Sequence, residues 1–162
     1  MTKIKRKVFY SFHFDNDVMR VQQVRNMGVL DGNTPVSPNE WEEVKRKGKS
    51  NIEQWIEDNM HGKSCVVVLI GTKTAERPWV KYEIEKAWKD GKGLLGIHVH
   101  NLTCPNNGKC LQGVDPFAQY TFRIGERIVK PKTYNPKSSD AYGDIAANLD
   151  DWVEEAIKIR NS

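Results

Sequence analysis

Short blocks of apolar residues alternate along the chain with longer stretches in which apolar residues recur every three or four positions. The blocks are rich in β-branched and aromatic residues, and they predict strands at residues 8–12, 65–70 and 94–99. Residues 65–70 (CVVVLI) are apolar at every position, which is typical of a parallel strand covered on both faces. Weaker patterns indicate shorter strands near residues 29–30 and within residues 120–129.

The stretches between the blocks have the apolar spacing of amphipathic helices. Five helices are predicted, at residues 17–28, 39–47, 50–60, 79–89 and 145–157. We expect Asp15 or Asp17 to cap the first helix and Ser50 to cap the third, while Pro78 opens the fourth. Residues 100–115 are predicted to form a long loop, and residues 134–142 are polar.

This alternation of strands and helices predicts the fold class. Buried strands joined by helices favour an α/β protein, a flavodoxin-like three-layer sandwich with a central parallel sheet of about five strands and right-handed crossovers. No internal repeat or linker divides the chain, so we expect a single domain over residues 1–162. Ligands of such folds bind beyond the carboxyl ends of the strands, here residues 11–17, 71–77 and 100 onward.

Composition and charge exclude several classes of protein. The 162 residues carry a net charge of only +4, and their basic and acidic side chains are interleaved, which argues against nucleic acid as the main partner. Three cysteines do not make a disulfide framework. No apolar run approaches the roughly 18 residues of a membrane helix, so we expect a cytoplasmic protein without membrane contact.

Motifs for phosphate loops and metal sites are missing or incomplete. Neither GxGxxG nor GxxxxGK[ST] occurs. Cys104 and Cys110 lack a second pair that would complete a zinc site. His98 and His100 are two residues apart and could share a strand face, but no third ligand is evident. We therefore expect neither a bound metal nor a resident cofactor.

The helix predicted at residues 79–89 carries a candidate catalytic group. Four residues at helical spacing form its apolar stripe, namely Val80, Ile84, Ala87 and Trp88. Trp79 and Glu83 lie one above the other beside this stripe, whereas Glu85 points toward solvent. Glu83 is therefore expected to be half-buried near an indole, where burial raises the pKa of a carboxyl group and strengthens its field on a bound cation. Alternatively, Glu83 pairs with Lys81 or Lys86 on a solvated face.

Residues 10–15 (YSFHFD), at the end of the first predicted strand, mix aromatic and hydrogen-bonding side chains. Aromatic rings in such a place can stack on a planar base or a pyridine ring, and Ser11, His13 and Asp15 offer hydrogen-bonding groups. The alternative is that Phe12 and Phe14 pack under the next helix and that Asp15 is only its cap.

These two segments resemble TIR domains. Residues 7–12 (KVFYSF) are similar to the first strand of that family, and Trp79-x-x-x-Glu83 is similar to its Trp-x-x-x-Glu helix. The closer resemblance is to the bacterial TIR-like family of Thoeris antiphage systems, which includes ThsB, and four segments carry it: residues 41–47, 67–71, 79–86 and 93–97. It covers about residues 7–101 and resumes weakly in the last helix.

The resemblance implies an NAD-consuming enzyme, with NAD as substrate. TIR enzymes cleave the bond between nicotinamide and ribose, and ThsB-like members make a cyclic ADP-ribose isomer that activates the effector ThsA. Glu83 matches the catalytic glutamate. The candidate substrate-binding residues are Ser11, Phe12, His13, Phe14, Asp15 and Trp79. Many catalytic TIR domains carry basic residues where His13 and Phe14 stand, so the candidates for the diphosphate are Arg20, Arg25 or Lys45.

The chemistry suits a carboxylate, because loss of nicotinamide leaves an oxocarbenium-like ribose that a nearby negative charge stabilises.

The main alternative is a non-catalytic TIR-like scaffold that signals through TIR–TIR assembly; a homo-oligomer through the same contacts fits either function. A receiver-like regulatory domain would need an acidic pair and a phospho-acceptor Asp that the strand ends lack. Nucleic-acid binding through Lys130, Lys132 and Lys137 is a third alternative.

Overall fold

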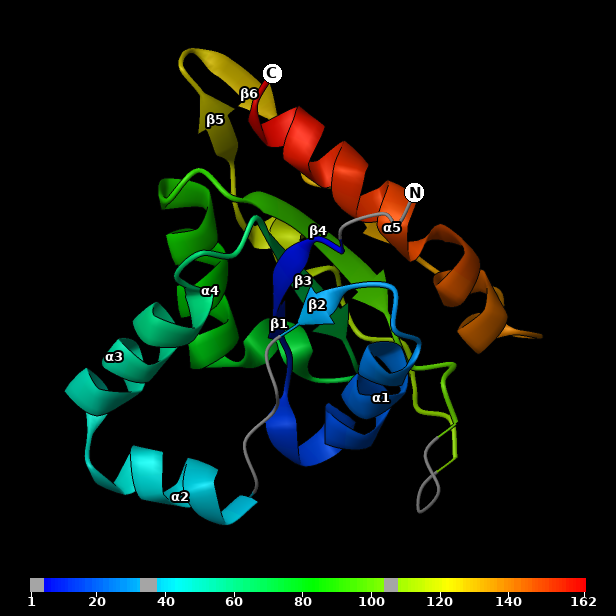
Figure 1. Ribbon diagram of the computed structural model, residues 1–162, viewed down its shortest axis with the longest axis horizontal. Helices are drawn as coiled ribbons and strands as arrows, with labels where there is room; N and C mark the ends of the chain where they lie inside the picture. The colour runs from blue at the N-terminus through cyan, green and yellow to red at the C-terminus, as the bar shows by residue number, and fades with distance from the viewer. Residues whose placement is uncertain (1–4, 33–37, 104–107) are drawn as a thin grey trace.

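Five parallel strands form the centre of the protein, in the order β2-β1-β3-β4-β7. Figure 1 labels β1, β2, β3 and β4 at the centre of the fold. Their bounds are β1 Lys7–Ser11, β2 Asp31–Gly32, β3 Cys65–Ile70, β4 Gly93–His98 and β7 Thr133–Tyr134. The computed structural model describes residues 5–32, 38–103 and 108–162, with the backbone alone at 14–16 and 38–41. The predicted fold class, a parallel sheet of five strands between helices, is confirmed.

The central strands are those with the most apolar sequences. Every residue of β3 and β4 is buried, and the two strands pair in parallel along their whole length, from Cys65 opposite Gly93 to Ile70 opposite His98. Because successive side chains point to opposite faces of a strand, β3 contributes alternately to two hydrophobic cores, one on each face of the sheet. Such double coverage is the reason for its unbroken apolar run.

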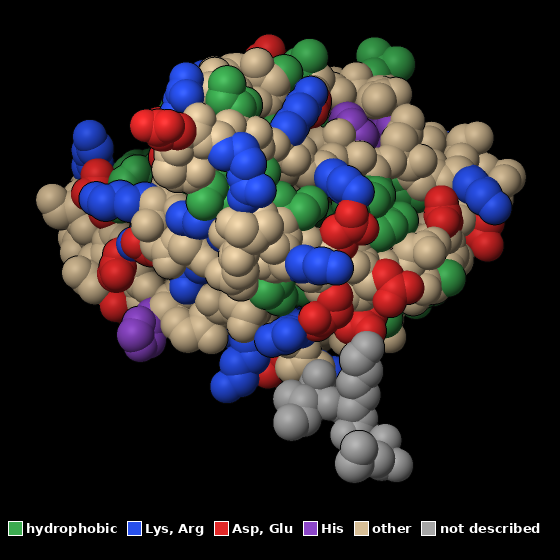
Figure 2. Space-filling model, turned by 90° about the horizontal axis from the view of Figure 1, so that it is seen from above, with side chains coloured by type: hydrophobic (Ala, Val, Ile, Leu, Met, Phe, Trp, Pro, Cys, Tyr) green, Lys and Arg blue, Asp and Glu red, His purple; other side chains and the backbone are tan. Residues whose placement is uncertain are grey.

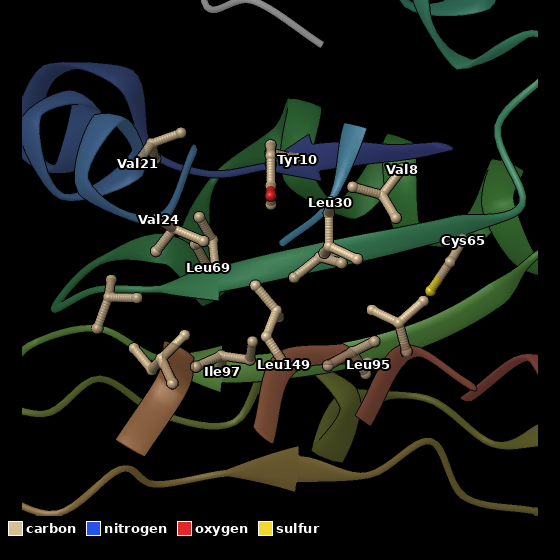
Figure 3. Packing of buried hydrophobic residues seen from close by; sticks show 14 of the residues in the cluster. Val8, Tyr10, Val21, Val24, Leu30, Cys65, Leu69, Leu95, Ile97 and Leu149 are labelled. Carbon is tan, nitrogen blue, oxygen red and sulfur yellow. The ribbon is translucent and has the colours of Figure 1, made fainter. Parts of the chain in front are cut away.

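Helices cover both faces of this sheet (Figure 1). Their bounds are α1 Phe14–Asn26, α2 Pro38–Arg46, α3 Lys49–Met60, α4 Pro78–Lys89 and α5 Ala141–Arg160. The α1–α5 core lies on one face and includes Val8, Tyr10, Val21, Val24, Cys65, Val67, Leu69, Leu95, Ile97, Ile145, Leu149 and Val153 (Figure 3). The α3–α4 core lies on the other face and includes Phe9, Ile52, Ile56, Met60, Val66, Val68, Ile70, Val80, Ile84, Ala87 and Leu94.

The prediction of a strand within residues 120–129 is confirmed, but this segment holds two strands rather than one. Two short strands, β5 Phe122–Ile124 and β6 Arg127–Val129, make an antiparallel hairpin apart from the main sheet. Gly125 turns the chain with a φ of +63°, a conformation that glycine adopts without strain. Only Phe122 of the hairpin is buried, which explains why charged residues interrupt its apolar pattern.

The fifth strand of the sheet is β7, at the start of the polar segment. It pairs with β4 through only two residues, Thr133 opposite Gly96 and Tyr134 opposite Ile97. A side chain at Gly96 would meet the Thr133 methyl group at 2.9 Å, so this glycine lets the edge strand approach closely. The short strand β2 likewise lies at Asp31–Gly32 rather than at residues 29–30. Strands of two residues leave no periodicity that sequence patterns can detect.

Two predicted helix caps are also wrong. The N-cap of α1 is His13, so the expected caps Asp15 and Asp17 lie inside the helix. The N-cap of α3 is Gly48, with a φ of 100°, rather than Ser50. Pro78 does open α4, as predicted. Within the described ranges, no helix combines the length and the apolar character that crossing a membrane requires.

Candidate functional site

The carboxyl ends of β1, β3 and β4 meet at one edge of the sheet, where the fold class predicts ligand binding. β1 ends at Ser11, β3 runs into Gly71, and β4 ends at His98. Pro78 starts α4 after the loop that follows β3, and the helix then packs across the α3–α4 face of the sheet. The site residues therefore come from segments far apart in the sequence.

A buried hydrogen bond joins two of the predicted site residues. Ser11 Oγ donates to Glu83 Oε1 at 2.7 Å, across 72 positions of the sequence. In β1, Phe9 belongs to the α3–α4 core, and strand alternation places Ser11 on the same face, toward α4. Ser11 is fully buried and Glu83 is only 7% exposed. The structure thus brings the strand end and the Trp-x-x-x-Glu helix together.

The alternative for Glu83, an ion pair on a solvated face, is wrong. Lys86 pairs with Glu57 and with Asp90, the latter at 2.8 Å. Glu85, two residues after Glu83, is exposed as predicted. Glu83 lies deeper than the expected half-buried position, because Val80, Ile84 and Ala87 seat this side of α4 against the sheet.

This burial changes the acidity of Glu83. Removal from water raises its pKa from 4.5 to about 8, while the hydrogen bond from Ser11 lowers it in part. The carboxyl group is therefore mostly protonated at neutral pH. A cation bound beside it would favour the carboxylate, so binding of a positively charged ligand would release a proton.

The other predicted residues lie in different surroundings. Phe12 is partly buried and packs against the α1–α5 core, on the other face of the sheet from Glu83. His13 is the half-buried N-cap of α1. The side chains of Phe14 and Asp15 lie outside the described residues, although both positions belong to α1. Trp79 is half-buried against the α3–α4 core, with its ring edge-to-face with Tyr82 at 5.6 Å.

Arg20, an expected diphosphate contact, is instead part of the interior. It is fully buried, and its guanidinium group lies 3.2 Å from the Asp17 carboxylate. The same group donates to the carbonyls of Leu102 and Gly108, at 3.0 and 2.8 Å. Arg20 thereby ties α1 to the segment after β4. The spacing of Asp17 and Arg20, one helical turn, was the only signal of this pair in the sequence.

The loop after β3 fits closely against this pair. A side chain on Gly71 would lie 2.0 Å from the Asp17 carboxylate, so no larger residue fits there without displacing it. The Gly71 amide donates to Thr74 Oγ1 at 2.7 Å, and Thr72 Oγ1 donates to the carbonyl of Leu111 at 2.7 Å. The buried carboxylate therefore restricts this position to glycine.

The side chains of His98 and His100 contact each other at the end of β4, as their spacing suggested. Their rings meet edge-to-face with centroids 5.9 Å apart, and the side chains are 6% and 8% exposed. Among the described residues, neither Nδ1 atom has a hydrogen-bond partner. Burial lowers the pKa of both rings, and the positive Arg20 and Lys109 lower that of His100 further. In the described part of the chain, no three potential ligands are grouped around a metal position.

Surface charge gives little support to a nucleic-acid interface. On the face shown in Figure 2, Lys and Arg side chains alternate with Asp and Glu side chains. Lys132, one of three lysines considered for such a role, forms an ion pair with Glu155. Proteins that bind nucleic acid cluster basic side chains on one face instead.

Comparisons with known proteins agree with this site. Residues 9–104 match the family model described as "Thoeris protein ThsB, TIR-like domain". The match includes the end of β1 and all of α4, and therefore both Ser11 and Glu83.

A curated relative from Bacillus cereus (strain MSX-D12), named "Putative cyclic ADP-D-ribose synthase ThsB1", is 31% identical over 117 residues. That alignment covers 69% of this chain and 61% of the relative, so the chain spans about three fifths of the relative's length. The chain belongs to the ThsB family of TIR-like domains.

Proposed function

We propose that this protein is an NAD-consuming TIR enzyme that releases nicotinamide and closes the remainder into a cyclic ADP-ribose isomer. The observation that carries the proposal is the buried Glu83 carboxyl group, held by Ser11 at the carboxyl edge of the sheet. The name of the Bacillus cereus relative, a cyclic ADP-D-ribose synthase, supports the same reaction.

Glu83 acts on the positive charge of the reacting ribose. When the bond between C1′ and the pyridinium nitrogen breaks, its electron pair stays with nicotinamide, which leaves as a neutral molecule and needs no general acid. The ribose becomes oxocarbenium-like, and the Glu83 carboxylate stabilises it in a site where little water screens the charge. Ser11 fixes one carboxylate oxygen, so the other can face the substrate.

Cyclisation requires that a nucleophile of the same molecule reaches C1′ before water does. The nucleophile forms the new bond to C1′ and loses its proton, which completes the product. A site that excludes water and holds the substrate folded favours this outcome over hydrolysis. The half-buried Trp79 is proposed as part of the wall of this site, and Phe12, His13, Phe14 and Asp15, which follow the end of β1, as residues that border it.

We further propose that residues 1–162 act as one TIR-like domain in the cytoplasm, and that the cyclic product activates a ThsA effector in Thoeris antiphage defence. Family membership supports this role. The test is whether product from the purified protein, freed of protein by filtration, switches on purified ThsA. Activation that needs the protein itself would favour a scaffold acting through TIR–TIR contacts.

The central experiment compares Glu83→Gln with Glu85→Gln. Both substitutions remove a carboxylate from α4, but only Glu83 is buried at the site, whereas Glu85 is exposed. NAD is incubated with each protein, nicotinamide is measured by chromatography and the nucleotide product by mass spectrometry, with phage-infected lysate added if the pure protein is silent. Glu83→Gln should lose about a thousand-fold in rate, and Glu85→Gln should keep the wild-type rate. Near-wild-type turnover by Glu83→Gln would contradict the proposal.

A further inference from the structure

The expected diphosphate contacts are already engaged in other interactions. Arg20 is buried against Asp17 and backbone carbonyls. Arg25 donates to Gln22 at 3.0 Å, and Lys45 pairs with Glu42 at 2.7 Å. An NAD-like substrate brings two negative phosphates, and the enclosed Arg20 is not open to them, so other groups at the carboxyl edge of the sheet are the candidates to hold a diphosphate.

The histidine at the end of β4 lies on the same face of the sheet as the reactive carboxyl group. In β4, Leu95 and Ile97 belong to the α1–α5 core, and strand alternation turns His98 to the opposite face, where Ser11 meets Glu83. Register fixes the spacing: Ser11 pairs with Val68, and Val68 pairs with Gly96, two residues before His98.

This register gives the distance between the two positions. Two strand spacings separate β1 from β4, and two residues separate His98 from the row of Ser11. The Cα atoms of Ser11 and His98 are therefore about 12 Å apart. The side chains of Glu83 and His98 are long enough to shorten that gap. A dinucleotide with its ribose at Glu83 can therefore place its phosphates near His98.

The charges beside His100 suit an anion, whereas Asp115 beside His98 opposes one. Arg20 and Lys109 act on His100, and both are positive; His98 faces His100 and the acidic Asp115. Structural histidines are normally fixed by a hydrogen bond to each buried nitrogen, yet neither Nδ1 has a partner among the described residues. Two buried rings without such partners have hydrogen-bonding capacity left for a ligand.

We propose that His98 and His100 bind the diphosphate of the substrate and take up a proton when they do so. This inference rests on the proposed function, since it concerns the same site. Burial disfavours the imidazolium form of both rings, and the positive Arg20 and Lys109 disfavour that of His100 further, so the pKa of each ring lies below its ordinary value before the substrate binds. An arriving phosphate compensates for that positive field, and the protonated ring donates to a phosphate oxygen.

Binding of ADP and of adenosine tests the inference without any turnover. The two probes differ only in the diphosphate, so their affinity ratio, measured by calorimetry, isolates its contribution. His98→Phe keeps an aromatic ring of similar size and should lower the affinity for ADP by about tenfold or more, while adenosine binding stays unchanged. His61→Phe is the matched control, because His61 is exposed at the opposite edge of the sheet.

The number of protons taken up on ADP binding is a second measurement, and a variant that only loosens the packing would not change it. Calorimetry of ADP binding at pH 7.5 in two buffers of different ionisation enthalpy should show net uptake in the wild type and less in His98→Phe. If the Phe variant does not fold, His98→Asn replaces it, since it keeps a polar side chain that cannot be protonated. Equal losses for ADP and adenosine, unchanged ADP binding, or no binding of ADP to the wild type would each overturn the inference. ADP binding without nicotinamide release would instead contradict only the proposed function.

Discussion

Glu83→Gln should make the protein more stable at neutral and alkaline pH, although it removes the proposed activity. The folded protein holds the carboxyl group in a buried position where its pKa is about 8, whereas the ordinary value is 4.5. Between these two values the folded state binds more protons than the unfolded state. The free energy of unfolding therefore falls as the pH rises through this window, and glutamine escapes the loss because it has no proton to release.

The size of the effect follows from the difference between the two pKa values. Each pH unit within the window costs the wild type about 1.4 kcal/mol. The Glu83→Gln substitution replaces a carboxyl group by an amide of equal size whose oxygen can still accept from Ser11, so the variant leaves no cavity. We expect the stability gain to be near zero at pH 4.5, about 3 kcal/mol at pH 7 and about 5 kcal/mol above pH 8.

Urea unfolding at several pH values between 5 and 9 measures this difference directly. The exposed Glu85→Gln is the control, because it makes the same substitution on the same helix at a solvent-exposed position. The prediction fails if the stability of Glu83→Gln follows that of the wild type in parallel across this range, since Glu83 would then titrate alike in both states.

Three further predictions concern the same edge of the sheet. The value of kcat/KM for NAD should rise about tenfold per pH unit and level off near pH 8, because the free enzyme needs Glu83 as carboxylate; a flat profile from pH 6 to 9 would contradict this. Ser11→Ala removes the hydrogen bond that lowers the pKa of Glu83, so the same pH profile should move to higher pH. Arg20→Met leaves the Asp17 carboxylate buried without its cation and should lower the free energy of unfolding by about 3–5 kcal/mol. The control is Arg25→Met on the same helix, where the arginine is half-buried; it should cost under about 1 kcal/mol. Urea unfolding measures both differences.

The apolar pattern was sufficient for the layered architecture, because burial on both faces of a strand leaves a direct trace in the sequence. Residues 65–70 are the clearest example, since each side chain must be apolar to enter one of the two cores. The stripe of α4 likewise identified the side of the helix on which Glu83 lies. Shorter strands leave a weaker pattern: residues 120–129 indicated a strand but not the β5–β6 hairpin, and the two residues of β7 were not predicted as a strand.

Local patterns were enough to show that Ser11 ends a strand and that Glu83 follows Trp79 on an amphipathic helix. The hydrogen bond between these two side chains depends on the assembled fold, because the register of β1 and the packing of α4 set that contact across 72 positions. The same holds for Arg20, which the sequence offered as a candidate contact for the diphosphate and which the fold instead encloses with Asp17. The type and spacing of a residue limit the chemical roles that are open to it. Its burial and its long-range partners decide which role it takes, and both arise only when the sheet assembles.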